Sequence, residues 1–261
     1  MRALVVAIGL LAFATAAADA KPKKKKSAAT ETTTKRAKKA DKKKAKRTAI
    51  RAHQREPFFE PRGPVHGQSV GAPWAGRLRD ATELPEGEGY VRRRPWRMFG
   101  TKSMVEAVYH AVGRVRETFP GIHVIAIGDM SAEQGGRISD HSSHQSGRDV
   151  DIGLIYNEKP AGYPESFIAA TKDNLDAEAT FTLIEELAAT KRVQMMFLDY
   201  KVQGMIVDWA RAHDVDEDKL DRLFQFPHGR GASDGLVRHE PNHMDHAHVR
   251  FKCPAGDSAC R

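Results

Sequence analysis

The sequence predicts one α+β domain over residues 57–261, with a small, mainly antiparallel sheet flanked by helices. Segments with the apolar pattern of strands are interleaved with segments of helical periodicity. Two polar motifs, the first at residues 144–151 and the second at 243–248, fall on short strands that are far apart in the chain. Periodicity alone does not distinguish this arrangement from an open α/β sheet.

The start of the chain has the features of a secretory signal peptide. Arg2 provides a positive charge, residues 3–14 are apolar, and Ala-Asp-Ala at 18–20 offers small residues at a cleavage site. We therefore expect residues 1–20 to be removed and the protein to be periplasmic or secreted. The apolar run is short for a membrane span, although it could serve as an anchor if it were not cleaved. No later stretch is apolar for long enough to cross a bilayer.

Residues 21–56 are predicted to form a disordered, Lys-rich tail and linker, because they contain almost no large apolar side chains. Residues 21–51 hold fifteen Lys and Arg against two acidic residues, a net charge of +13. The whole chain carries +8, so the residues from 52 onward carry −5. The tail could bind anionic polymers of the cell envelope or membrane surfaces, or it could be a solvated spacer. Export argues against a nucleic-acid partner.

The first half of the domain is predicted to contain loops, one helix and one strand. Residues 57–100 are rich in Gly, Pro and Arg, which favours short elements that wrap the core. Ser103-x-x-Glu106 has the form of a capping box, and apolar residues then recur at helical spacing until Pro120. Residues 123–127 form an apolar strand that leads into a loop.

The loop at residues 128–140 contains Gly135 and Gly136, which allow tight backbone turns close to the first motif. Apolar and acidic residues alternate over 148–156, which predicts the strand of that motif until Asn157 interrupts it.

The second half of the domain is predicted to alternate helices and strands. Helical periodicity covers residues 176–190 and 202–213, and a further short helix can follow at 216–226. An apolar strand covers 193–198, and the second motif continues into a strand that ends near Phe251.

Cys253 and Cys260 are the only cysteines, and they follow the second motif directly. In an oxidising compartment we expect them to form a disulfide, which would contribute at most about 2–3 kcal/mol because the loop is small. Two free cysteines are the alternative. Metal binding by these thiols is not expected, because the chain offers no further cysteine to complete such a site.

Each polar motif presents several functional side chains on one face of its strand. Side chains alternate along a strand, so Asp149 and Asp151 share a face. His246 and His248 likewise share a face, and Arg250 follows in the same phase. Two strands that are distant in sequence can therefore direct polar side chains into one cleft.

His144, Asp151 and His248 can together supply the three protein ligands that catalytic zinc usually takes, with a fourth position left for water. The alternative is that the twelve histidines of the chain are solvated polar residues. Their clustering favours the metal site. The clustered histidines are His141 and His144 before the first strand, and His239, His243, His246 and His248 around the second.

Two segments carry a family resemblance. Ser143-His-Gln-Ser-Gly-Arg-Asp-Val-Asp-Ile152 and Arg238-His-Glu-Pro-Asn-His-Met-Asp-His-Ala-His-Val-Arg250 resemble the penicillin-insensitive murein endopeptidases. That family belongs to the group that unites lysostaphin-type peptidases, D-Ala-D-Ala metallopeptidases and hedgehog domains (the LAS group). The similarity begins near Ser69 and ends near Phe251. It implies a four-stranded sheet with zinc on its face, and it favours Asp151 over Asp149 as the ligand.

The resemblance also implies roles for the remaining histidines. His246 lies two positions from His248 and is expected to act as general base and then general acid, with a hydrogen bond to a ligand as the alternative role. His141 and His243 match histidines that line the family's cleft, so they are expected to bind the substrate or the transition state. Either could instead be a weak fourth zinc ligand. Asp245 and His239 are expected to be structural or solvated.

We therefore expect residues 57–261 to be the catalytic domain of a zinc metallopeptidase, with one Zn²⁺ per site. The resemblance implies hydrolysis of peptidoglycan stem-peptide cross-links between D-alanine and meso-diaminopimelate. The alternatives are a D-Ala-D-Ala carboxypeptidase or dipeptidase of the same group and a non-catalytic cell-wall-binding protein. The sequence does not indicate an oligomeric state.

Overall fold

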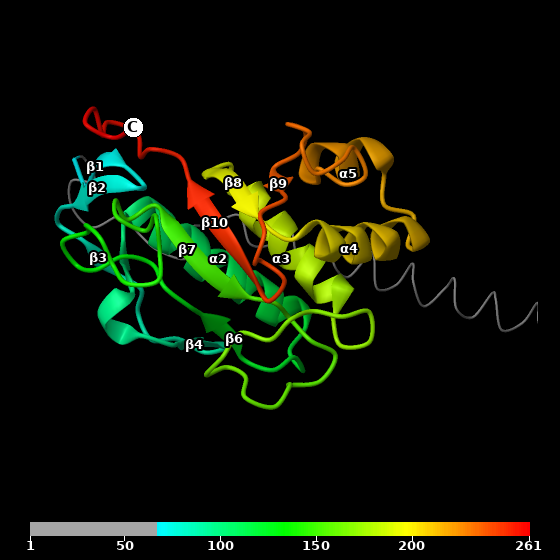
Figure 1. Cartoon of the computed structure of the whole chain (residues 1–261). Helices are drawn as coiled ribbons and strands as arrows, with labels where there is room; N and C mark the ends of the chain where they lie inside the picture. The colour runs from blue at the N-terminus through cyan, green and yellow to red at the C-terminus, as the bar shows by residue number, and fades with distance from the viewer. Residues whose placement is uncertain (1–66) are drawn as a thin grey trace, which may run out of the picture. The chain divides into compact units, whose positions relative to one another are not determined.

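The computed structural model of the chain describes residues 67–261 (Figure 1). The expected signal peptide and Lys-rich tail lie outside the described residues, as does the start of the expected domain up to residue 66. The described part contains both helices and strands, so the expectation of a mixed fold is confirmed. No helix within it is both long and apolar enough to cross a membrane.

The central sheet has six strands in the order β4-β6-β7-β10-β8-β9. The four inner strands pair in antiparallel fashion, whereas β4 pairs parallel to β6 and β9 pairs parallel to β8. The sheet is therefore antiparallel at its centre but larger than the four strands that the family resemblance implies. The strands are β4 (Tyr90–Arg92), β6 (Ile125–Ile127), β7 (Asp149–Gly153), β8 (Val193–Phe197), β9 (Val237–Arg238) and β10 (His246–Phe251).

Short elements precede the first long helix, as the composition of residues 57–100 predicts. Among them β4 is an edge strand of the main sheet, which the sequence did not reveal because three residues are too few for a recognisable alternation. The others are β1 (Ser69–Ala72), β2 (Ala75–Leu78), β3 (Thr82–Glu83), the 3₁₀ helix η1 (Pro95–Arg97) and β5 (Phe99–Gly100).

The helices of the described part are α2 (Lys102–Thr118), α3 (Ala177–Ala189), α4 (Tyr200–Ala212) and α5 (Glu217–Leu223). The capping box predicted at Ser103 is wrong. Thr101 caps α2, because its side chain accepts a hydrogen bond from the Met104 backbone N–H at 3.3 Å. Its own N–H donates to the Gly147 carbonyl at 2.8 Å, and its backbone is extended at the point where the helix begins.

The strand predicted over residues 148–156 ends at Gly153. Leu154, Ile155 and Tyr156 are nevertheless almost completely buried. Their apolar character therefore reflects burial in the core after the chain has left the sheet, and the sequence pattern does not separate the two causes.

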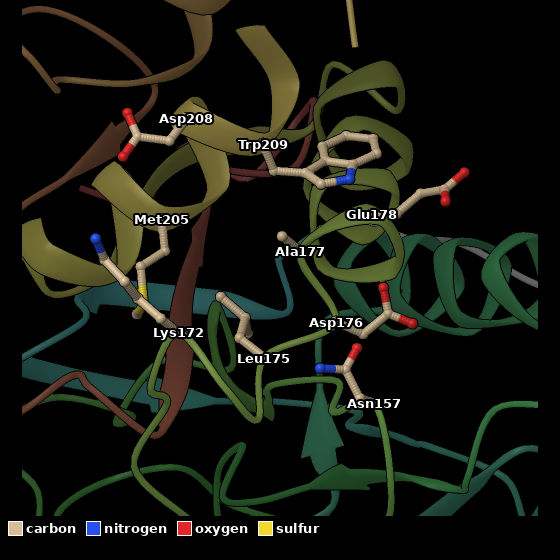
Figure 2. Close-up of a pocket in the computed structure, with 9 residues that line it drawn as sticks. All are labelled: Asn157, Lys172, Leu175, Asp176, Ala177, Glu178, Met205, Asp208 and Trp209. Atoms are coloured by element: carbon tan, nitrogen blue, oxygen red, sulfur yellow. The ribbon is translucent and has the colours of Figure 1, made fainter. Parts of the chain in front are cut away.

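Helices α3 and α4 contact each other and border a hollow with a volume of 540 Å³ (Figure 2). Met205 and Trp209 of α4 and Leu175 supply its apolar wall, while Asp176 and Asp208 supply carboxylates. The hollow contains no histidine.

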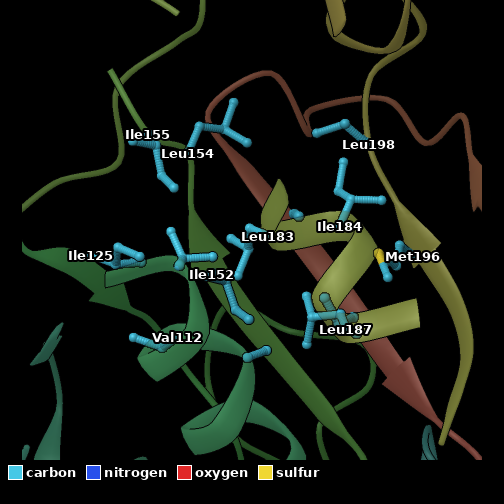
Figure 3. Close-up of a cluster of buried hydrophobic side chains, with 14 of the residues drawn as sticks. Val112, Ile125, Ile152, Leu154, Ile155, Leu183, Ile184, Leu187, Met196 and Leu198 are labelled. Atoms are coloured by element: carbon cyan, nitrogen blue, oxygen red, sulfur yellow. The ribbon is translucent and has the colours of Figure 1, made fainter. Parts of the chain in front are cut away.

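The core lies between the sheet and helices α2 and α3 (Figure 3). Leu183, Ile184 and Leu187 of α3 pack in the same cluster as Ile152 of β7 and Met196 of β8. Because side chains alternate along β7, the packing of Ile152 against the helices directs Asp151 to the opposite face of the sheet. The hydrophobic core thus determines which face carries the polar motifs.

Cys253 and Cys260 form the expected disulfide just after β10. The C-terminal segment also packs against β1, because the Gly71 N–H donates to the Ala259 carbonyl at 2.8 Å and the Arg261 N–H donates to the Gly71 carbonyl at 3.0 Å. The segment that follows β10 is therefore held by the disulfide and by its hydrogen bonds to β1, which limits movement of the end of the strand.

Candidate metal-binding cleft

A cleft with a volume of 660 Å³ lies over the face of the sheet that carries the polar motifs. The register of the β7–β10 pair builds its floor, because His248 lies directly opposite Asp151 and Arg250 lies opposite Asp149. The rim includes the side chain of Trp74, which is 61% exposed. The cleft therefore joins side chains from both motifs.

His144 reaches the cleft from the loop before β7, in a left-handed backbone conformation with φ of 64°. Its N–H donates to Asp149 at 3.0 Å, and its carbonyl accepts from the Ser131 hydroxyl at 2.6 Å. Its Nδ1 lies 2.8 Å from the Met130 carbonyl oxygen, which can only accept, so Nδ1 carries the proton. In its neutral form the ring therefore presents an unprotonated Nε2 to the cleft.

Gly135 and Gly136 allow the loop at residues 128–140 to lie close to the backbone that follows His144. A Cβ at Gly135, where φ is 63°, would lie 2.4 Å from the Gln145 carbonyl oxygen. The Gly136 N–H donates to the same oxygen at 2.8 Å. The tight turn predicted from the Gly-Gly pair thus packs directly against the loop of His144.

In the cleft, one carboxylate oxygen of Asp151 lies close to a nitrogen atom of each of two histidines. Asp151 Oδ1 lies 3.4 Å from His144 Nε2 and 3.4 Å from His248 Nδ1. Within the described residues, the buried atoms His144 Nε2 and Asp151 Oδ1 have no hydrogen-bond partner. Unpaired polar atoms are rare in protein interiors, and an ion is one of the groups that can satisfy them. The chemistry of these donors fits a bound metal cation.

The electrostatics of the cleft also favour a cation. Burial alone would lower the pKa of His144, but the carboxylates of Asp151 and Asp149 raise it to about 9. Burial would raise the pKa of Asp151, yet His144, His248 and His246 hold it well below its usual value. A site that binds a proton on a buried histidine this strongly can exchange that proton for a metal ion.

Asp149 lies behind the cleft and is almost completely buried. Its Oδ1 accepts from Arg250 Nε at 2.8 Å and lies 3.4 Å from His248 Nε2. Within the described residues His248 Nε2 has no hydrogen-bond partner, so its contact with Asp149 is electrostatic. This placement leaves His248 Nδ1 to face Asp151.

His141 lies beside His144 and Asp151. It can join a ligand set with His144 and Asp151, since the three residues offer ligand atoms within 4.8 Å of one another. However, its Nε2 lies 2.8 Å from Asp129 Oδ2, so that nitrogen donates a proton to a carboxylate. Its Nε2 would have to give up this bond before it could bind a metal ion.

Asp129 is a buried carboxylate that contacts His141, Arg94 and Arg97. Burial would raise its pKa, but hydrogen bonds from His141 and Arg97 and the charge of Arg94 hold the pKa below its usual value. Arg94 and Arg97 both come from the segment around η1. Sequence reasoning missed this group, because nothing in the local pattern connects η1 with the loop of His141.

His246 lies in the cleft with its Nε2 3.8 Å from Asp151 Oδ1. Its Nδ1 lies 2.6 Å from Asp245 Oδ1, so Nδ1 donates and the neutral ring has a basic Nε2. Asp245 therefore has a structural contact, because its carboxylate holds the ring of His246. The sequence could have indicated this contact, because Asp245 directly precedes His246 and a carboxylate beside a histidine can orient its ring.

His243 lies on the same side of the cleft, with its ring centroid 4.8 Å from that of His246. Its Nδ1 donates to the Pro241 carbonyl at 2.8 Å, and burial lowers its pKa. A neutral ring with a free Nε2 can contact a polar substrate group. His239, by contrast, accepts a hydrogen bond from the Tyr200 backbone N–H at 3.1 Å, which is a structural role.

The sequence of the chain is similar to the sequences of known proteins. Residues 69–224 match the sequence profile of a family described as penicillin-insensitive murein endopeptidase. The chain is 28% identical over 213 residues to the penicillin-insensitive murein endopeptidase of Escherichia coli (strain K12 / DH10B), which covers 76% of this chain and 70% of that protein. The protein of the same description from Shigella boydii serotype 18 gives the same values. The profile match includes the first motif and ends before the second.

The charge pair behind the cleft is expected to contribute to stability without any metal. Replacing Asp149 by Ala leaves Arg250 without its carboxylate and the His144 N–H without its acceptor, so the free energy of unfolding should fall by about 3–5 kcal/mol. Denaturant titration of the chelator-treated protein measures this change. The control is Glu86→Ala, which removes an ion pair whose carboxylate is 87% exposed and should cost about 1 kcal/mol or less. Equal effects of the two substitutions would contradict the prediction.

Proposed function

The chain belongs to the penicillin-insensitive murein endopeptidase family, and from that premise we propose that it is an exported zinc metallo-endopeptidase of peptidoglycan. The family itself establishes a peptidase whose relatives are named for activity on murein. The observation that carries the finer proposal is the approach of both His144 Nε2 and His248 Nδ1 to Asp151 Oδ1.

Zinc fits this donor set by ligand type and by the two distances from Asp151 Oδ1 to the histidines. Tetrahedral ligands at about 2.0–2.1 Å from zinc lie roughly 3.3–3.4 Å from one another. Both distances from Asp151 Oδ1 are 3.4 Å, which matches that spacing. The proposed ligands are therefore His144, Asp151 and His248, with His141 as the alternative fourth ligand. Zinc held there would supply the Lewis acidity that activates water and stabilises negative charge on a carbonyl oxygen.

In this proposal His246 moves the proton that peptide hydrolysis requires. Its Nε2 can accept a proton from water, and the protonated ring can then donate that proton to the leaving amine. Asp245 keeps the proton of the neutral ring on Nδ1 and stabilises the imidazolium that forms. His243 and His141 flank the reacting position and are proposed to bind the substrate or the transition state.

The proposed fold is that of the LAS metallopeptidase group. The support is the four-stranded antiparallel centre of the sheet, with the histidines of β10 on the face opposite the core. Periplasmic or secreted location is also part of the proposal, and it is supported by the pattern of residues 1–20 and by the cell-wall substrate for which the relatives are named. The +13 charge of residues 21–51 suits contact with anionic envelope polymers.

The proposed reaction is hydrolysis of the cross-link between D-alanine and meso-diaminopimelate. Purified sacculi should be converted from cross-linked to uncross-linked muropeptides, and mass spectrometry of the products identifies the bond. Release of free terminal D-alanine from uncross-linked peptides would instead indicate a carboxypeptidase. Binding to sacculi without any new product from the zinc-loaded protein would indicate a non-catalytic protein.

Zinc content tests the ligand set directly. The mature protein is expected to bind about one zinc, and His144→Ala, Asp151→Ala and His248→Ala should each remove most of it, because each deletes one of three ligands. Elemental analysis after dialysis measures the content. His228→Ala is the matched control, since His228 is paired with Asp221 away from the cleft and should leave the zinc content unchanged. Full zinc content in all three ligand variants would refute the assignment.

His246 separates catalysis from metal binding. His246→Ala should keep zinc and fold but lose about 10²- to 10⁴-fold in kcat, the usual contribution of general acid-base catalysis. His243→Ala should also keep zinc, with part of its loss in KM because it removes a substrate contact. Steady-state kinetics on a purified cross-linked dimer measure both. If His246→Ala lost zinc while His248→Ala kept it, the roles of the two histidines would have to be exchanged.

A further inference from the structure

The imidazole ring of His246 is held from two directions. In its own plane, Nδ1 is bonded to Asp245. Against its face lies the phenyl ring of Phe167, with a centroid distance of 4.8 Å and an interplanar angle of 16°. The hydrogen bond alone would leave the ring free to tilt about the Nδ1–Oδ1 direction. The stacked phenyl ring restricts that tilt.

Phe167 comes from neither polar motif. It belongs to the loop between β7 and α3, and the same loop contacts the second motif where the Ala170 N–H donates to the Met244 carbonyl at 2.8 Å. Phe167 is partly buried against the core cluster. The loop therefore passes beside the residues that precede β10, and it brings a rigid aromatic side chain to the catalytic face.

Arg93 fixes this loop from the other side. Its guanidinium carbon lies 4.2 Å from the centroid of the Phe167 ring. Its Nε and Nη2 also donate to the Glu165 carbonyl, at 3.2 and 2.8 Å. The Arg93 backbone N–H in turn donates to the Ile127 carbonyl of β6 at 2.9 Å. Phe167 is thus anchored to the sheet through Arg93.

Gly128 provides the space that the phenyl ring occupies. A Cβ at this position would lie 2.6 Å from Phe167 Cζ and 3.1 Å from Asp151 Cβ. Its φ is not in the left-handed region, so backbone conformation does not require glycine here. The absence of a side chain at Gly128 is explained by the close approach of Phe167 beside Asp151.

We infer that Phe167 is a positioning residue for His246, and that Gly128 and Arg93 hold Phe167 in place. This inference rests on the proposed catalytic role of His246. The stack keeps the ring in the orientation in which Nε2 faces Asp151 and the reacting position. A displacement of about 1 Å in a catalytic group can cost about 10²-fold in rate, so a ring without this support should transfer protons less effectively.

The kinetic test compares Phe167→Leu and Gly128→Ala with the zinc-loaded wild-type protein on a purified cross-linked dimer. Both should retain zinc and lose about 10- to 100-fold in kcat, with little change in KM, because the ring is misoriented while substrate contacts remain. Phe167→Tyr keeps the aromatic face and should retain most of the activity. Phe226→Leu is the matched control, since Phe226 is a partly buried aromatic residue that packs on Tyr200 and should leave kcat unchanged.

A double substitution shows whether the loss acts through His246. In the His246→Ala background, Phe167→Leu should cause no further decrease in kcat, because the group that it positions is already absent. A further 10-fold or larger decrease in the double variant would overturn the inference, as would wild-type kcat in Phe167→Leu.

An NMR measurement tests the stack without reference to activity. In the zinc-loaded protein with labelled histidines, a phenyl ring at this distance should shift the ring protons of His246 upfield, and His246→Ala identifies the signal by its disappearance. Phe167→Leu should abolish the shift and Phe167→Tyr should preserve it. An unchanged signal in Phe167→Leu would overturn the inference. Wild-type activity of His246→Ala would instead overturn the proposed role of His246, which keeps the two failures distinguishable.

Discussion

The antiparallel pairing of β7 with β10 determines how the polar groups of the cleft meet. It sets His248 opposite Asp151 and Arg250 opposite Asp149, so each buried carboxylate of β7 has a specific partner across the strands. The pairing is held by the core on its other face, where Ile152 lies opposite Ala247. The cleft and the core thus depend on the same two strands, and a change that loosens one must affect the other.

Three buried carboxylates face this side of the molecule, and their partners differ. Asp129 is paired with Arg94 and Arg97, and Asp149 is paired with Arg250. Asp151 has only histidines among its ion-pair partners within the described residues. Arginine is always protonated, whereas histidine can exchange its proton for a metal ion. The distribution of arginines therefore leaves Asp151 as the carboxylate that is available to a cation.

Residues other than the candidate metal ligands hold the histidines of the cleft in place. Asp245 orients His246 in the plane of the ring, and the loop before α3 supplies Phe167 against its face. On the other side, η1 supplies the arginines that hold Asp129 and, through it, His141. Preorganisation of this kind is what limits the freedom of catalytic groups in a site.

The sequence by itself determined the mixed fold, most helix bounds and the faces of the strands, because periodicity is a local signal. The histidines and Asp151 are also predicted from the sequence as metal ligands, and the structure brings ligand atoms of His141, His144 and Asp151 within 4.8 Å of one another. Only the tertiary structure decided which of these side chains contact one another. A shift of two residues between β7 and β10 would keep every side chain on its face yet set Arg250 opposite Asp151, so alternation cannot specify the register. The contacts of Asp129 with His141 and of Phe167 with His246 likewise depend on the paths of loops, which no local pattern encodes.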